Sequence, residues 1–206
     1  MKTSLRLAAI ATALALAVPA FAQQSTQSTP AKVGIGVGMP TNLFGGLLTT
    51  IGSATGVPEG PQIYVPINVS PNLRVEPQFG YIANTDDEFD ETDSSFTLGA
   101  GVLYVMPVAQ QTNLYVGGRL TLTWTKDENH AGTALVKTTQ RSTSIAPVFG
   151  GEYVPSPRFS VGAEAQLDFI SLSDPKVEIT GAPTQTFQGG STRSTQALVF
   201  VRVYFM

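Results

Sequence analysis

Apolar and polar residues alternate with a period of two along most of the chain. Eight segments show this rhythm, at residues 32–39, 61–69, 73–83, 94–106, 113–126, 139–153, 159–172 and 194–205. A period of two is typical of β-strands, in which successive side chains point to opposite faces. The weakest place in this pattern is 43–48, where a helical turn fits. The pattern therefore predicts an all-β protein with eight strands.

The connections between these segments alternate in length. The long ones are 40–60, 84–93, 127–138 and 173–193, and the short ones are 70–72, 107–112 and 154–158. The short connections contain Pro, Asn, Ser and Gln, which favour tight turns. Short turns at one end and long loops at the other are typical of an up-and-down outer-membrane barrel, with the long loops outside the cell.

Each predicted strand has one apolar face and one polar face. In a membrane barrel the apolar face points to lipid and the polar face points into the interior. Eight charged residues, four of each sign, share the polar face and predict an interior ion network: Lys32, Arg74, Glu76, Arg119, Glu152, Glu164, Asp168 and Arg202. The outward-facing Lys126 and Arg141 sit at long-loop ends, where lipid headgroups can meet them.

Aromatic residues on the apolar face lie near the strand ends. Those toward the long loops are Tyr81, Phe96, Trp124 and Phe169, and those toward the short turns are Tyr104, Tyr153, Phe159 and Phe205. The two groups are separated along tilted strands by roughly 20–25 Å, the height of a membrane-barrel apolar band. A soluble core would place its aromatic residues mid-strand. We therefore predict two aromatic girdles and an eight-stranded antiparallel transmembrane barrel.

The amino terminus has the layout of a cleavable secretory signal peptide. Lys2 and Arg6 precede the apolar run 7–18, and Ala20-Phe21-Ala22 provides small residues at a cleavage site. The run is too short to span a bilayer as a helix. We expect cleavage after Ala22, so that 1–22 is the signal peptide, 23–31 a flexible polar leader and 32–206 the barrel.

The last nine residues before Met206 alternate apolar positions and end on Phe205. This segment resembles the C-terminal strand of outer-membrane barrels, shifted by one residue because Met206 follows the aromatic ring. With the signal peptide and eight strands, the chain resembles the small outer-membrane barrels of the OmpA, OmpX and OmpW type. The resemblance implies an outer-membrane location and recognition of the last strand by the barrel assembly machinery, and we expect a monomer.

Composition argues against several function classes. Without Lys2 and Arg6, ten basic residues remain against 15 acidic ones, a formal net charge of −5, which gives no footprint for nucleic acid. There is no cysteine for a disulfide, a zinc–thiolate site or a thiol nucleophile. The acidic run 84–93 lacks the ligand spacing of a calcium loop. The single histidine, His130, lies in a predicted loop without a nearby serine, which disfavours catalysis.

These observations predict a non-enzymatic outer-membrane barrel without a cofactor or metal. Its expected role is structural or surface-interacting, through long external loops above a salt-bridged interior. The expected partners are membrane lipid and lipopolysaccharide, and the surface ligand stays open. A narrow channel for small or hydrophobic solutes is the alternative, and a lipid-modifying enzyme is the least favoured function.

Overall fold

The computed structural model describes residues 32–41, 60–86, 91–131 and 134–205. One antiparallel sheet contains all its strands: β1 (Val33–Thr41), β2 (Gln62–Tyr64), β3 (Ile67–Ser70), β4 (Leu73–Asp86), β5 (Glu91–Ala109), β6 (Thr112–Ala131), β7 (Ala134–Ser156), β8 (Phe159–Leu172), β9 (Lys176–Ile179), β10 (Gln185–Thr186) and β11 (Gly190–Phe205). The predicted signal peptide, its cleavage after Ala22, the leader 23–31 and the helical turn at 43–48 lie outside the described residues.

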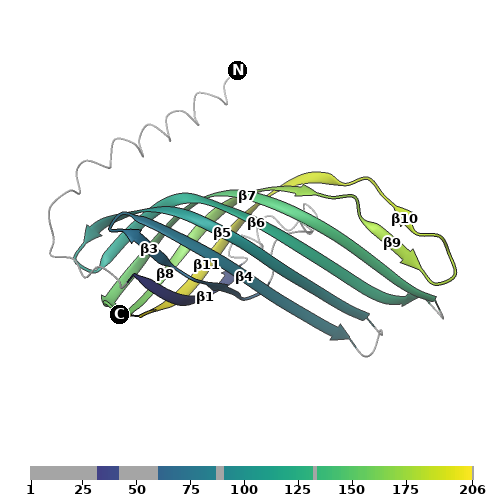
Figure 1. The fold of residues 1–206 in the computed structure, drawn as a ribbon, viewed down its shortest axis with the longest axis horizontal. Coiled ribbons are helices and arrows are strands. Elements are labelled where there is room, and N and C mark those ends of the chain that lie inside the picture. Colours follow the sequence, from purple (N-terminus) through teal and green to yellow (C-terminus); the bar gives the residue numbers. More distant parts are fainter. Residues whose placement is uncertain (1–31, 42–59, 87–90, 132–133, 206) are drawn as a thin grey trace, which may run out of the picture.

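The sheet closes on itself into an eight-stranded barrel. The last strand β11 pairs with β8 on one side and with the first strand β1 on the other, with Val33 opposite Phe205. The ring continues from β1 through β2 and β3 to β4, and then in chain order to β8. Figure 1 shows the closed end on the left, with β1 and β11 side by side. The predicted all-β barrel with eight strand positions is confirmed.

The second strand position is divided where proline interrupts it. The predicted segment 61–69 forms β2 and β3, with Val65 and Pro66 between them. Pro66 has no amide hydrogen, but its carbonyl still accepts the Gly34 N–H at 2.9 Å, and the Val65 N–H donates to the Pro77 carbonyl at 2.8 Å. Both neighbours therefore remain connected across the break.

The ring strands meet in three very short turns at one end. β3 and β4, β5 and β6, and β7 and β8 are each separated by two residues. The carboxyl end of β11 lies at this same end (Figure 1). The predicted short connections are confirmed, and the turns are tighter than the sequence indicates.

At the opposite end, strands extend into three of the predicted loops. β4 and β5 reach into 84–93, and β6 and β7 reach Ala131 and Ala134, so the loop prediction for 127–138 is wrong. The region 173–193 contains β9 and β10, and β9 pairs with β7 beyond the end of β8. Figure 1 shows this sheet extending to the right of the barrel. We define the outer extension as residues 81–86 of β4, 91–96 of β5, 124–131 of β6 and 134–141 of β7, together with the whole of β9 and β10.

The outward face of the ring is apolar and the inward face is mixed. Every strand position has apolar side chains on the outward face that keep between 36% and 65% of their surface exposed; examples are Ile35, Leu98, Leu120, Ile145 and Val201. No helix among the described residues has the length and apolar character needed to cross a membrane. The exposed aliphatic residues form a continuous apolar band around the ring.

Candidate functional site

Three arginines and three glutamates meet inside the barrel. Each is at most 2% exposed, and they come from five strands: Arg74, Glu76, Arg119, Glu152, Glu164 and Arg202. We call these six residues the interior network. Their positive and negative charges balance, so the network needs no further counter-ion.

Arg119 on β6 joins one half of the network. Its guanidinium donates to both carboxylate oxygens of Glu164, from Nε at 2.7 Å and from Nη2 at 2.8 Å. Nη2 also lies 2.7 Å from Oε2 of Glu76, and Nη1 donates to the Gln78 amide oxygen at 3.1 Å. A bidentate pair of this kind fixes the guanidinium in one plane.

Glu152 on β7 joins the other half. It accepts two bonds from Arg74, at 2.7 and 3.0 Å, and one from Arg202 at 2.9 Å. Asn113 donates a further bond at 3.1 Å. Arg202 links the halves, because its Nη2 lies 2.7 Å from Oε1 of Glu76. All six charged groups therefore form one connected cluster across the barrel.

Aromatic rings pack against these guanidinium groups. Arg119 lies over the Tyr64 ring at 4.9 Å, and Arg202 lies over the Phe200 ring at 3.7 Å. With neighbouring aliphatic residues the rings form a buried apolar cluster: Tyr64, Leu103, Val105, Tyr115, Ala146, Val148, Leu198 and Phe200. Sequence reasoning missed this cluster, although its members have inward parity on their strands.

Glycines on the inward face make space for these large side chains. A Cβ on Gly36 would lie 2.7 Å from Cγ of Arg202, and one on Gly38 would lie 2.6 Å from the Tyr64 ring. A Cβ on Gly101 would lie 2.8 Å from Nη1 of Arg119. The Gly pairs on β1 and β5 therefore admit the arginines and tyrosines that fill the interior.

Two residues assigned to the interior network do not join it. Lys32 is exposed and stands one position before β1, so its assignment to the interior is wrong. Asp168 is 5% exposed, but among the described residues its partner is a hydroxyl, since Ser144 donates to it at 2.8 Å. Strand parity places Asp168 inward but does not bring it to an arginine.

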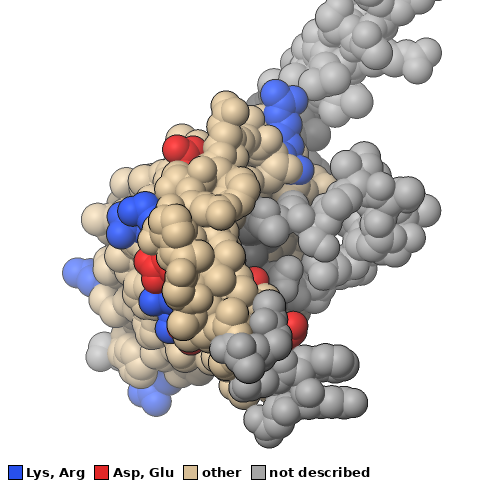
Figure 2. Space-filling model, turned by 90° about the vertical axis from the view of Figure 1, so that its right-hand side faces the viewer, with Lys and Arg blue, Asp and Glu red and all other residues tan. Residues whose placement is uncertain are grey.

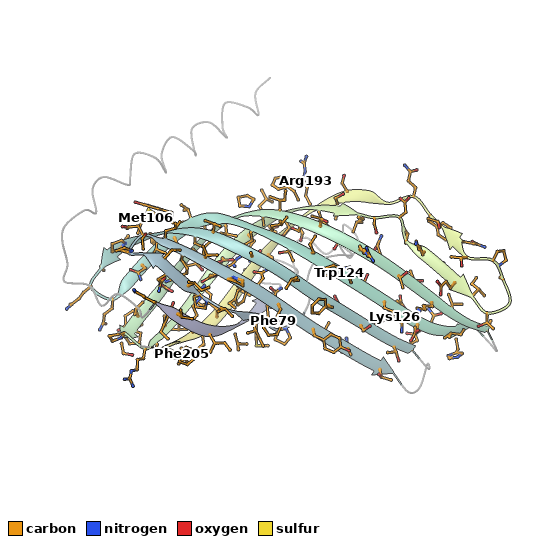
Figure 3. The ribbon with its side chains drawn as sticks, viewed as in Figure 1. Phe79, Met106, Trp124, Lys126, Arg193 and Phe205 are labelled. Atoms are coloured by element: carbon orange, nitrogen blue, oxygen red, sulfur yellow. The ribbon has the colours of Figure 1, made fainter. Side chains whose placement is uncertain are left out.

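The eight predicted girdle residues point away from the barrel interior. Seven are between 37% and 65% exposed, and Trp124 is half-buried: Tyr81, Phe96, Tyr104, Trp124, Tyr153, Phe159, Phe169 and Phe205. Tyr81, Phe96 and Trp124 are direct cross-strand neighbours, with the Phe96 and Trp124 rings 5.7 Å apart. Figure 3 shows Trp124 at the start of the outer extension and Phe205 at the opposite end of the barrel.

His130 and the described acidic residues of the run 84–93, which are Asp86, Glu91 and Asp93, lie on the outer extension. His130 is on β6 rather than in a loop. Within the described ranges, no group of three His, Asp or Glu side chains is arranged to hold a metal ion. Figure 2 views this end of the molecule and shows both basic and acidic side chains dispersed over a mainly uncharged surface.

Two carboxylates face each other directly on the outer extension. Asp127 is opposite Asp93. Partial burial, and after it the negative charge of Asp93, raise the pKa of Asp127 above its ordinary value of 3.8. A raised carboxyl pKa means that the folded state binds the proton more tightly than the unfolded state. The contribution of Asp127 to the stability of the folded state is therefore fully present below pH 3.8. It is lost as the pH rises through the raised pKa of the folded state.

We expect Asp127→Asn to slow local opening of the β5–β6 end at pH 7, because it removes the repulsion with Asp93. Amide hydrogen exchange of Asp93 and Asp127, corrected for intrinsic rates, measures this effect. Glu128→Gln is the control, because Lys126 lies 2.8 Å away and lowers the pKa of Glu128. Equal protection in wild type and Asp127→Asn at both pH 4 and pH 7 would contradict the expectation.

The chain is similar to known outer-membrane barrel proteins. A family model described as outer membrane protein beta-barrel domain matches residues 8–193. The crystal structure of Neisserial surface protein A is 15% identical, with a TM-score of 0.50, covering 84% of this chain and 94% of the other. The attachment invasion locus protein Ail of Yersinia pestis is 11% identical, with a TM-score of 0.43, and the match covers 84% of this chain and 93% of Ail.

A major outer membrane protein from Thermus thermophilus is 14% identical, with a TM-score of 0.46, covering 82% of this chain and 98% of the other. No curated protein matches the chain. At these identities the likeness to Neisserial surface protein A concerns the fold alone.

Proposed function

The chain belongs to the outer membrane protein beta-barrel domain family, and from this premise we propose that it is a closed barrel that acts through its outer extension rather than as a pore. The apolar band and its aromatic ends suit a ring embedded in lipid, as in this family. The interior network then lies within the membrane, and the outer extension projects beyond it. The short turns lie at one end of the barrel and the outer extension lies at the other. In outer-membrane barrels the short turns face the periplasm, which supports an orientation with the outer extension outside the cell.

The observation that carries the proposal is the closure of the interior by the network. An eight-stranded barrel is just wide enough to be filled by its own side chains. Here six charged groups, each at most 2% exposed, bond to one another across that width. Tyr64, Tyr115 and Phe200 fill space beside them. An ion that crosses the barrel would have to break several of these contacts at once.

The outer extension provides the surface that such a barrel offers to its surroundings. β6 has 20 residues and β7 has 23, whereas a tilted membrane strand needs about 9–11. The remaining residues continue the sheet outside the apolar band. A rigid sheet on a stable scaffold holds side chains in a fixed arrangement, which favours surface interaction.

Single-channel recording in planar bilayers tests the closed barrel. We expect the refolded protein, shown to be folded by its heat-dependent gel shift, to give no discrete openings under an applied voltage. The matched variant is Arg119→Ala, which removes a side chain that spans from Glu164 to Glu76 and is expected to admit ions. Reproducible wild-type openings whose conductance changes in Glu164→Gln would instead show a narrow channel and overturn the proposal.

A further inference from the structure

A cleft opens on the outer surface where the apolar band ends. Its volume is about 740 Å³, and its lining includes Tyr81, Phe96, Trp124, Lys126, Arg141 and Lys176. These residues come from β4, β5, β6, β7 and β9, so the cleft crosses the base of the outer extension. It is separate from the interior network, whose side chains point to the other face of the sheet.

Cross-strand pairing arranges the cleft into an apolar side and a basic side. Tyr81 is opposite Phe96, Phe96 is opposite Trp124, and Trp124 is opposite Arg141. This row is the outer aromatic girdle, and it ends in a cation. Aromatic rings of this kind lie at the level of lipid headgroups.

The next row outward carries two further cations. Lys126 is opposite Thr139, and Thr139 is opposite Lys176. Figure 3 shows Lys126 beyond Trp124 along β6, toward the end of the outer extension. Three basic side chains therefore meet at the boundary between the apolar band and water.

Two of the three cations have no ionic partner on the described part of the chain. Lys126 pairs with Glu128 at 2.8 Å, but no described carboxylate lies within 4.0 Å of the charged groups of Arg141 or Lys176. The one acid in the lining, Asp174, uses Oδ1 to accept the Gly189 N–H at 2.7 Å. The cleft thus has more positive charge than its own residues neutralise.

A hydroxyl beside Arg141 adds a hydrogen-bond donor. The Arg141 backbone N–H donates to Oγ of Ser173 at 3.0 Å, which leaves the Ser173 hydroxyl hydrogen free to donate elsewhere. Guanidinium, ammonium and hydroxyl donors together suit the oxygens of a phosphate group. An anion held there would be next to the aromatic row.

We propose that this cleft binds the phosphate-bearing headgroup of an outer-membrane lipid. The phosphate contacts Arg141 and Lys176, with Lys126 nearby, and the first part of an acyl chain lies along Tyr81, Phe96 and Trp124. Charge complementarity and the position of the cleft at the edge of the apolar band support a membrane lipid over a soluble anion. The inference does not depend on whether the barrel is closed to ions.

Trp124 is the only tryptophan in the chain and lies in the cleft, so its emission reports directly on occupancy. Folded protein in phosphatidylcholine bicelles is titrated with bis-phosphorylated lipid A, and we expect a saturable change in emission. Lipid A with both phosphates removed and inorganic phosphate alone are parallel titrations, and both are expected to leave the emission unchanged. They separate the phosphate requirement from the lipid requirement.

The double variant Arg141→Gln/Lys176→Gln is expected to weaken binding by about tenfold or more, because each basic residue near a lipid surface contributes to the attraction. Arg193→Gln is the matched control, since Arg193 lies over the exposed Phe169 ring at 5.6 Å, outside the cleft, and is expected to bind like wild type. The heat-dependent gel shift verifies that each variant is folded.

Several results would overturn the lipid site. Equal binding of the dephosphorylated lipid would remove the role of the phosphate, and saturation by inorganic phosphate would make the cleft a site for a soluble anion. Equal weakening by Arg193→Gln would show unspecific surface attraction. A wild-type titration without saturation would contradict the site altogether, while leaving the conductance experiment unaffected.

Discussion

Replacing Glu152 with alanine is expected to destabilise the folded barrel by about 3–5 kcal/mol, because it leaves buried charges without their partner. Glu152 accepts bonds from Arg74, Arg202 and Asn113 inside the barrel. The two arginines would keep Glu76 as a shared partner, at 3.7 Å from Arg74 and 2.7 Å from Arg202. Glu76, which also pairs with Arg119 at 2.7 Å, would then face three guanidinium groups that little water reaches.

The measurement is reversible unfolding in urea with the protein in lipid vesicles, followed by the gel shift and by Trp124 emission. Glu128→Ala is the matched control, because its ion pair with Lys126 is only half-buried and lies outside the barrel interior, and it is expected to unfold like wild type. An unchanged midpoint for Glu152→Ala would show that water enters the barrel and screens the arginines. That result would also weaken the case for a closed interior.

A charge-balanced replacement separates the burial of charge from the loss of packing. Arg119→Leu alone leaves Glu164 buried without its bidentate partner. Arg119→Leu together with Glu164→Leu removes both charges, and we expect it to be less destabilising than Arg119→Leu alone. A double variant that loses the sum of both single effects would show that the two side chains act independently.

Strand parity places the network inside the barrel, but parity alone does not give its pairing. Arg74, Arg119 and Glu152 all have inward positions because side chains alternate along a strand. Arg74 and Glu152 are 78 positions apart in the chain, and their contact depends on barrel closure and on the register of the strands between them. The sequence carries no local signal for either quantity.

Lys32 and Asp168 show where the same reasoning fails. Lys32 continues the inward rhythm of its segment, but it stands one position before β1 and its side chain is exposed, even though the Asn68 N–H of β3 donates to its carbonyl at 2.7 Å. Asp168 is inward and buried, yet Ser144 on the adjacent strand is its hydrogen-bond partner. Parity gives the side of the sheet, whereas the position along the barrel axis decides which side chains meet.

The hydrophobic pattern of the sequence does not predict the strands of the outer extension, and the reason is physical. Within the apolar band, one face meets lipid and the other meets the interior, so hydrophobicity alternates. Beyond Trp124 both faces of β6 meet water, and the residues Lys126, Asp127 and Glu128 are polar on both sides. Backbone pairing with β7 continues there, as far as Ala131 opposite Ala134, without any hydrophobic period to indicate it.

Placing a methyl group on the inward face at Gly162 is expected to destabilise the barrel by about 3 kcal/mol or to prevent folding, because overpacking of this kind typically costs about 1–3 kcal/mol and occasionally more. A Cβ at this position would overlap the Gly151 carbonyl oxygen and would lie 2.5 Å from Cζ of Phe200 and 2.9 Å from Cα of Glu152. Two of these neighbours are backbone atoms of the paired strand β7, which cannot rotate away.

Gly162→Ala and Gly118→Ala therefore form a matched pair for the same urea experiment. A Cβ on Gly118 would have the Ala146 carbonyl oxygen as its nearest neighbour, at 3.8 Å, which is an ordinary contact, so this variant is expected to unfold like wild type.

Adding Phe200→Leu to Gly162→Ala relieves the contact with the ring but not the contact with the backbone, and we expect only partial recovery of stability. Full recovery would show that the ring alone sets the limit, and equal stability of both glycine variants would mean that β7 and β8 can separate enough to accommodate a side chain. Because Gly162 is opposite Glu152, such a separation would also disturb the bonds to Arg74 and Arg202, so close backbone packing and the charged network are expected to depend on each other.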